Sequence, residues 1–302
     1  MNQPRLIEFK TEDKLILPGL LYEAGTSDKI AINLHGNGSS SVFYDQEDGL
    51  DLPSELAGVG ISLLRFNNRG AHIIKKLNIY SNKIKKDRKS YGCAYETIKE
   101  CVFDINAALK FVKNLSYKEF YLIGKSTGAN KVCVYDYYNL GSEFSKYVLI
   151  CGGDDTGIYY DLLGDKLFYK LLSKSKKKIK NGDGDQISQE LLKFEEIFSY
   201  KSFFDIANPD GDYNCFPFSE VLGRAKLSKK PLFRYFKNIK KPSLVVYGSK
   251  DEYCWGSVSK IVSWMKKLKP DFSYEIIKGA DHGFNGKKEA LAVVVANYLI
   301  ST

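Results

Sequence analysis

A serine flanked by glycines lies in the segment 124–128, which reads GKSTG. The pattern G-x-S-x-G is typical of a sharp turn between a strand and a helix, where a serine hydroxyl is held as a nucleophile. The flanking positions need little side chain because the turn is strained and closely packed. Apolar residues at 120–123 precede the turn, and a helical pattern at 128–138 follows it. This context predicts Ser126 as a nucleophile, with a glycine–serine turn that has no chemical role as the alternative.

A serine hydroxyl is a weak nucleophile until a base takes its proton. The chain has only 3 histidines, and His282 is the predicted base because it lies in a glycine-rich loop after the last predicted strand. Asp251 is the predicted acid that orients the imidazole and stabilises its charged form, with Glu252 as the alternative. The order serine, aspartate, histidine along the chain is one of the orders in which such triads occur.

Two backbone amides must stabilise the negative charge that develops on the substrate oxygen. Thr127, directly after the nucleophile, is one predicted donor. The turn at 35–38, which reads HGNG and follows a predicted strand at 30–34, is expected to supply the other. We predict Asn37 as the second donor of this oxyanion hole and Gly38 as the alternative. An ordinary Asn–Gly hairpin turn is the competing interpretation, although no hairpin partner strand follows it.

Several neighbouring residues are expected near a substrate. Gly38 lets the backbone approach it closely, and Lys125 is a long cation beside the nucleophile. Lys125 either favours acidic substrates or points away into the helix. His72 follows the strand predicted at 61–66 and is expected at the pocket mouth, as a weak candidate for the base. His35 is expected to hydrogen-bond to loop backbone.

The elements that must position these residues follow a β-α pattern, which predicts an α/β fold with a mostly parallel sheet. The range 156–239 lacks a convincing parallel strand and is interpreted as an inserted helical cap, with a catalytic core at 1–155 and 240–302. Strands are predicted at 6–9, 15–22, 30–34, 61–66, 120–123, 147–150, 243–247 and 274–277, and helices at 98–112, 128–138, 159–172, 186–198, 257–268 and 287–299.

Composition narrows the classes of protein that this sequence can encode. The 302 residues contain no apolar run as long as a membrane helix, and the first residues lack the apolar centre of a signal peptide. The cysteines form no C-x-x-C pair, so we expect reduced thiols and a cytoplasmic protein. Their positions are Cys93, Cys101, Cys133, Cys151, Cys215 and Cys254.

The formal net charge is +9, and much of it lies in Lys-rich runs at 83–89 and 174–180. Such runs attract nucleic acid, anionic lipid or an anionic substrate, or they form a solvated surface. The solvated surface is the preferred interpretation because neither run is rich in arginine or interleaved with aromatic residues. We therefore expect no nucleic-acid partner and no membrane partner.

Motifs in one order along the chain make it resemble the α/β-hydrolase superfamily over essentially its whole length. Within that superfamily it is similar to the esterase branch, as in feruloyl and siderophore esterases. The resemblance implies an eight-stranded sheet, a cap between the sixth and seventh strands, and acyl-enzyme chemistry with no metal and no cofactor. Lys125 departs from the apolar or uncharged residue found in many members. The motifs are HGNG at 35–38, RFNNRG at 65–70, GKSTG at 124–128, YGSKDE at 247–252 and GADHGF at 279–284.

The sequence therefore predicts a serine esterase that acts on small acyl or aryl esters, as a monomer or a homodimer. Lactones such as acyl-homoserine lactones, thioesters and short peptides are alternative substrates for the same triad. A binding protein that keeps the fold without catalysis is an alternative of another class, and a basic nucleic-acid-binding protein is a third. Aromatic residues of the predicted cap either line a substrate pocket or form the interior of the cap.

Overall fold

A computed structural model describes residues 3–38, 41–44, 51–81 and 84–301. Its main feature is an eight-stranded sheet in the order β1-β2-β4-β3-β7-β8-β9-β10. β1 pairs with β2, and β2 with β4, in antiparallel fashion, and the other pairs are parallel, so the predicted α/β fold class is confirmed. The strands are β1 (Arg5–Lys10), β2 (Ile16–Tyr22), β3 (Lys29–Leu34), β4 (Ile61–Phe66), β7 (Glu119–Lys125), β8 (Lys146–Ile150), β9 (Ser243–Gly248) and β10 (Ser273–Ile277).

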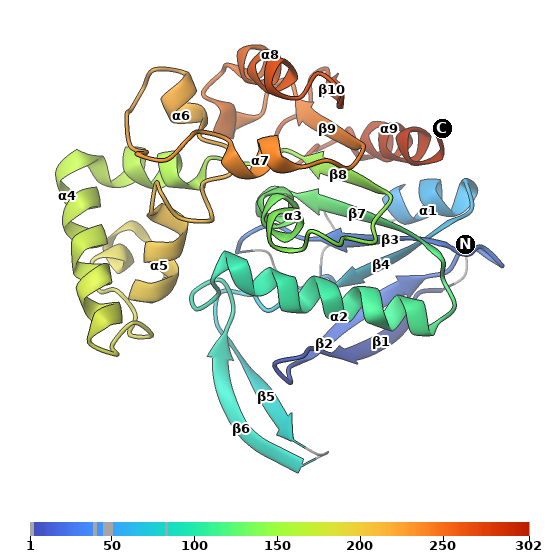
Figure 1. Ribbon diagram of the computed structural model, residues 1–302, viewed down its shortest axis with the longest axis horizontal. Helices are drawn as coiled ribbons and strands as arrows, with labels where there is room; N and C mark the ends of the chain where they lie inside the picture. Colours follow the sequence, from blue (N-terminus) through green and yellow to red (C-terminus); the bar gives the residue numbers. More distant parts are fainter. Residues whose placement is uncertain (1–2, 39–40, 45–50, 82–83, 302) are drawn as a thin grey trace.

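Burial along the strands explains why this sheet is parallel at its centre. Every residue of β4 and β9 is buried, whereas β1 at the edge alternates between exposed and buried positions near its end. Strands that are apolar on both faces need helices on both sides of the sheet. Figure 1 shows α2 (Cys101–Asn114) and α3 (Thr127–Tyr138) on one face, and α1 (Asp51–Gly58) and α9 (Lys288–Ile300) on the other. α8 (Val258–Leu268) connects β9 to β10.

The chain between β8 and β9 forms an insertion of helices and loops at one side of the sheet (Figure 1). Its helices are α4 (Asp155–Lys180), which is kinked at Gly164, α5 (Tyr200–Ala207), α6 (Phe218–Val221) and α7 (Arg234–Asn238). The insertion lies between the sixth and seventh strands of the main sheet in chain order. A separate cap domain at 156–239 stays a prediction.

One predicted helix of the insertion is wrong. The range 186–198 contains only a short 3₁₀ turn, η2 (Leu191–Phe194), inside a loop whose two ends pair with each other. Ser188 N donates to Phe198 O at 2.9 Å, and Glu195 has a left-handed φ of 61°. The paired ends and the left-handed residue are incompatible with a continuous helix, because a helix needs a right-handed backbone at every position.

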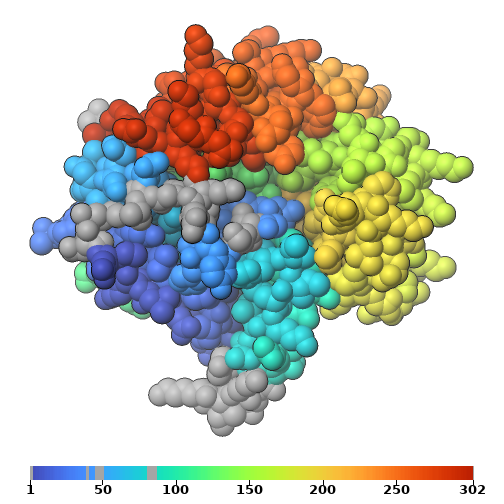
Figure 2. All heavy atoms as spheres, turned by 180° about the vertical axis from the view of Figure 1, so that it is seen from behind, coloured from blue at the N-terminus to red at the C-terminus, as the bar shows by residue number. Residues whose placement is uncertain are grey.

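A hairpin that the sequence did not predict projects from the body of the molecule. β5 (Lys75–Ser81) and β6 (Ile84–Tyr91) pair in antiparallel fashion, and both views show the hairpin, coloured cyan, standing out from the sheet (Figures 1 and 2). The Lys-rich run at 83–89 falls on β6, except that Lys83 lies outside the described residues. The second Lys-rich run, at 174–180, forms the C-terminal end of α4.

Two further observations bear on the expectations from composition. All the cysteines are buried free thiols. Among the described residues, no helix has both the length and the apolar character that a bilayer-spanning segment needs.

Candidate active site

Ser126 occupies the sharp turn that the motif predicts. β7 ends at Lys125 and α3 begins at Thr127, so a single residue separates the strand from the helix. The backbone of Ser126 has a left-handed φ of 56°, and its N–H donates to Ile150 O at 2.8 Å. Because this turn brings the chain so close to itself, a Cβ at Gly124 would lie 2.2 Å from Gly128 O. A Cβ at Gly128 would lie 2.3 Å from Leu34 O, so both flanking glycines are required by close approach.

The three residues of the predicted triad lie together at the carboxyl ends of their strands. His282 Nε2 is 3.1 Å from Ser126 Oγ, and His282 Nδ1 is 3.0 Å from Asp251 Oδ2. Asp251 follows β9, and His282 follows β10. The side chain of Asp251 is only 1% exposed, and its Oδ1 also accepts a hydrogen bond from Tyr253 N at 3.0 Å. A buried carboxylate held in this way fixes the orientation of the imidazole.

The alternative acid, Glu252, binds backbone and not the imidazole, since its Oε2 accepts a hydrogen bond from His282 N at 3.0 Å. The neighbouring Asp281 also binds backbone, because its carboxylate accepts a hydrogen bond from Asn285 N at 2.9 Å. Both carboxylates therefore shape the loop that presents His282.

Sequence reasoning missed one neighbour of the triad: the buried thiol of Cys151 lies within 4.8 Å of a carboxylate oxygen of Asp251 and of a ring nitrogen of His282. Its position at the end of β8 was the only available signal.

The predicted oxyanion hole lies beside the nucleophile. A Cβ placed on Gly36 would be 3.0 Å from Ser126 Cβ, which puts the turn at 35–38 against the serine. In the described part of the chain, the amides of Asn37 and Thr127 donate no hydrogen bond to another protein group. Thr127 is also the first residue of α3, and the N-terminal end of a helix carries a partial positive charge. Two unused amides at this place suit a developing negative charge.

A cavity of about 740 Å³ opens over the serine. Of the residues predicted near a substrate, Gly38 and Lys125 line it. His72 is not among its described lining residues, but its ring centroid lies 6.5 Å from that of Tyr44, which does line it. Lys125 Nζ is 3.5 Å from Gly283 O, and Lys125 also borders a second, smaller pocket.

His35 makes the backbone contact that was expected of it. Its Nδ1 lies 2.8 Å from Gly36 O, whereas its buried Nε2 has no partner among the described residues. Burial, and then the positive charge of Lys131, lower the pKa of His35 to about 3. The ring therefore stays neutral at physiological pH. This leaves His282 as the histidine in contact with Ser126.

The insertion supplies an acidic wall that sequence reasoning missed. Asp155, Glu195 and Glu196 all line the cavity, and Tyr159 OH donates to Glu196 at 3.1 Å. Burial, followed by the negative charge of neighbouring Asp154, raises the pKa of Asp155 to about 7. Burial also raises the pKa of Glu196. The sequence offers no motif for these residues, because only the folded insertion brings them to the serine.

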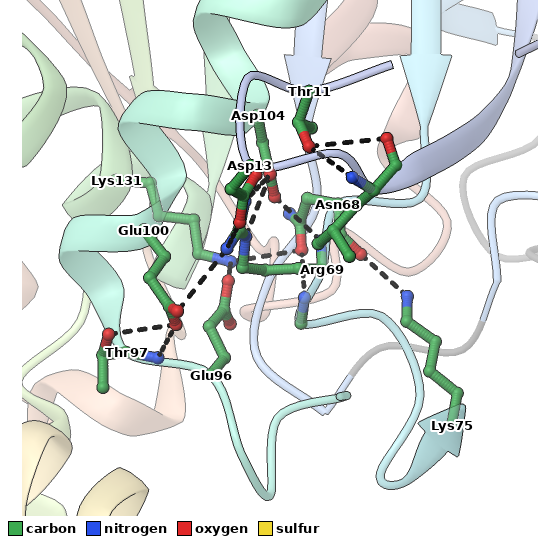
Figure 3. Close-up of polar contacts among 12 residues, drawn as sticks. Thr11, Asp13, Asn68, Arg69, Lys75, Glu96, Thr97, Glu100, Asp104 and Lys131 are labelled. Carbon is green, nitrogen blue, oxygen red and sulfur yellow. Dashed lines mark hydrogen bonds and ion pairs between the residues drawn. The ribbon is translucent and has the colours of Figure 1, made fainter. Parts of the chain in front are cut away.

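Behind the site lies a buried ionic network, defined as Asp13, Arg69, Glu96, Asp104 and Lys131 (Figure 3). Arg69 Nε donates to Asp104 Oδ1 at 3.0 Å, and Arg69 Nη1 donates to Asp13 at 2.9 Å. Lys131, on α3, pairs with Glu96 at 2.6 Å. Lys131 Nζ also donates to Asn68 Oδ1 at 3.3 Å, which joins the loop after β4 to α3, the helix that starts at the nucleophile. Arg69 joins the same loop to α2 and to the segment before β2, and a Cβ on Gly70 would lie 1.9 Å from Glu96 Oε2, so these contacts account for Arg69 and Gly70 of the RFNNRG motif.

Solved structures resemble this chain along almost its whole length. The esterase Pf2001 of Pyrococcus furiosus is 20% identical, with a TM-score of 0.59 over 98% of this chain and 90% of that chain. Est1E of Butyrivibrio proteoclasticus with bound ferulic acid is 16% identical, with a TM-score of 0.63 over 97% of each chain. The α/β hydrolase GrgF of Penicillium sp. sh18 is 14% identical, with a TM-score of 0.62 over 99% of this chain and 98% of that chain. The fold is therefore that of the α/β hydrolases.

The family is shown by the sequence itself. Residues 77–301 match the family described as "Protein of unknown function (DUF1749)", so the chain belongs to that family. No curated protein matches the sequence.

Proposed function

We propose that this chain is a serine carboxylic ester hydrolase with Ser126 as nucleophile, His282 as base and Asp251 as orienting acid. The observation that carries the proposal is the position of His282, with one ring nitrogen 3.1 Å from Ser126 Oγ and the other 3.0 Å from Asp251 Oδ2. This arrangement transfers a proton from the hydroxyl while a carboxylate stabilises the resulting imidazolium. The fold shared with proteins named as esterases supports the assignment.

In the first half-reaction, Ser126 Oγ attacks the ester carbonyl carbon as His282 Nε2 takes the hydroxyl proton. The carbonyl oxygen becomes an oxyanion, which the amides of Asn37 and Thr127 stabilise. The tetrahedral intermediate then collapses, the bond to the alcohol oxygen breaks, and His282 returns its proton to that oxygen. The alcohol leaves, and the acyl group stays on Ser126.

In the second half-reaction, water takes the place of the alcohol. The water oxygen attacks the acyl carbon as His282 accepts a proton from the water. The amides of Asn37 and Thr127 stabilise the second oxyanion. The intermediate expels Ser126 Oγ, which regains a proton from His282, and the carboxylic acid is released. Lactones, thioesters and peptides can react by the same steps, but the fold shared with esterases favours esters.

The substrate that we propose is a small acyl or aryl ester. The cavity of about 740 Å³ lies within the range of small-molecule sites. A binding protein without catalysis is a weaker proposal, because a hydroxyl, an imidazole and a carboxylate in hydrogen-bond contact are not needed to hold a ligand.

The test is hydrolysis of 4-nitrophenyl esters with acyl chains of increasing length. Ser126→Ala should lower kcat by about 10³-fold or more, because it removes the attacking oxygen. Ser273→Ala, at the exposed start of β10, is the matched control and should keep the wild-type rate. Equal rates for Ser126→Ala and the control would overturn the assignment of the nucleophile.

A further inference from the structure

We propose that the natural substrate carries an ammonium group, which binds the carboxylate of Asp155 on the cavity wall formed by the insertion. This inference rests on the proposed ester hydrolysis, since it assigns a substrate class to the same cavity. It predicts that the protein selects amine-bearing esters over neutral ones.

Asp155 and its neighbour Asp154 differ in their partners. Asp154 accepts hydrogen bonds from Gly157 N at 2.7 Å and from Ser219 N at 2.7 Å, which satisfy it as the N-cap of α4. Asp155 lines the cavity, and its Oδ2 is sealed from solvent without any partner. In the described part of the chain, no other residue donates a hydrogen bond to its carboxylate. Asp155 is half-buried, and a carboxylate withdrawn from water without a protein partner is costly, so its retention on the cavity wall favours a partner that the chain does not supply.

The surroundings of Asp155 select for positive charge. Glu195 and Glu196 line the same cavity, and Glu196 binds the hydroxyl of Tyr159. This acidic wall belongs to a chain whose formal net charge is +9, so it does not simply reflect the overall composition. Lys125 adds a positive charge at the serine end of the cavity, and its Nζ faces Gly283 O at 3.5 Å.

An aromatic ring completes the cation site. Tyr253 lines the cavity, is 43% exposed, and packs edge-on against the His282 ring with centroids 4.6 Å apart. Burial raises the pKa of Tyr253, and the negative charges of Glu252, Asp251, Asp155 and Glu196, in that order, add to the rise. An exposed aromatic face beside carboxylates attracts an ammonium group through its quadrupole.

Other ligand groups fit this wall less well. A carboxylate or phosphate would be repelled by Asp155, Glu195 and Glu196. A neutral hydroxyl can donate one hydrogen bond, but it leaves the carboxylate charge without compensation. An ammonium group supplies both donors and an opposite charge, and such charge-assisted hydrogen bonds are the stronger kind.

The experiment compares three isosteric 4-nitrophenyl esters at pH 8, namely heptanoate, 6-hydroxyhexanoate and 6-aminohexanoate. Asp155→Asn should lower kcat/KM for the amino ester by about tenfold or more while changing the heptanoate value little, because hydrogen bonds to charged groups are worth about one to two powers of ten. Asp165→Asn, an exposed carboxylate on the same helix, is the matched control and should change neither value. An unchanged ratio in Asp155→Asn, or a stronger dependence of the hydroxy ester on Asp155, overturns the inference.

Calorimetric binding of n-hexylammonium and 1-hexanol to the wild-type chain needs neither a variant nor turnover. Tighter binding of the ammonium ion supports the inference, and equal or weaker binding overturns it. Failure of all three esters to react, together with tighter ammonium binding, would overturn the proposed hydrolysis and leave the cation site standing. Rapid hydrolysis of all three esters at similar rates would support the proposed hydrolysis and overturn the cation site.

Discussion

Buried charges are paired in one region of this molecule and unpaired in another. In the buried ionic network, the side chains of Arg69 and Asp104 are 0% and 1% exposed, and Arg69 Nη2 lies 2.7 Å from Asp104 Oδ1. Lys131 and Glu96 form an equally close pair on the adjoining helix and loop (Figure 3). On the cavity wall, by contrast, Asp155 has a sealed oxygen with no partner among the described residues.

This difference distinguishes charges that stabilise the fold from polar groups that are left to bind a ligand. A charge that is satisfied by neighbouring side chains holds elements together and leaves nothing for a ligand. A polar group that is buried without a partner lowers the stability of the fold, and function is the usual reason for its retention. Oδ2 of Asp155 belongs to the second kind, and the amides of Asn37 and Thr127 likewise have no partner among the described residues.

The largest effect that we predict is on the triad. Asp251→Asn should lower kcat for ester hydrolysis by about 10³- to 10⁴-fold, because the amide no longer holds the correct imidazole tautomer. The free energy of unfolding should change little, since the amide oxygen still accepts from Tyr253 N. Rates on 4-nitrophenyl esters and urea unfolding measure the two quantities. Glu252→Gln, which changes the neighbouring acid, should lower kcat far less. A larger loss of kcat in Glu252→Gln than in Asp251→Asn would contradict the role of Asp251.

Substitutions in the buried ionic network should lower the free energy of unfolding, whereas Asp251→Asn lowers the catalytic rate. Lys131→Met leaves Glu96 buried without its partner, so we expect a loss of about 3–5 kcal/mol in the free energy of unfolding. The double variant Lys131→Met/Glu96→Leu should recover much of that loss, because no charge then remains unpaired. Urea unfolding of both variants checks this. A single variant that unfolds like the wild type would show that the pair contributes no structural stabilisation.

Asp155 should oppose folding as the pH rises. Its folded pKa, about 7, lies above the ordinary value of 3.8, so the stability present with the acid protonated is lost between about pH 4 and pH 7. Asp155→Asn should therefore match the wild type at pH 4 and exceed it at pH 8, by about 1–2 kcal/mol after allowance for partial exposure. Unfolding in urea at the two pH values measures this. A wild type that is the more stable at pH 8 would contradict the unpaired state of Asp155.

The smallest effect should come from an exposed ion pair. Lys113 and Glu143 lie 2.7 Å apart, but their side chains are 44% and 52% exposed. Lys113→Met should lower the free energy of unfolding by less than about 1 kcal/mol, because solvent screens the attraction. A loss as large as that of Lys131→Met would show that burial does not decide the contribution of these pairs.

The fold and the triad residues were predictable because their signals are local. A strand followed by G-x-S-x-G and a helix identifies Ser126 from adjacent residues. Asp251 and His282 each follow directly on a predicted strand, and parallel strands bring such loops to one edge of the sheet. The structure brings these three side chains together.

Features that depend on distant contacts were not predictable in this way. Arg69 and Asp13 pair across 56 residues, and no spacing rule connects them. Asp155 is one of many acidic residues until the insertion folds over the serine. The range 186–198 has helix-forming residues, but the pairing of its ends, Ile187 with Ser199, overrides that local preference.

Labelling with a fluorophosphonate, followed by peptide mass spectrometry, tests most directly whether Ser126 is the nucleophile. One adduct is expected, on Ser126, because among the serines that the structure describes only this one contacts a histidine that is itself held by a buried carboxylate. The adduct should be absent in Ser126→Ala, slower in Asp251→Asn, and unchanged in Ser273→Ala. A folded wild-type chain that takes no label, or takes it on another serine, would contradict the assignment of Ser126 as the nucleophile.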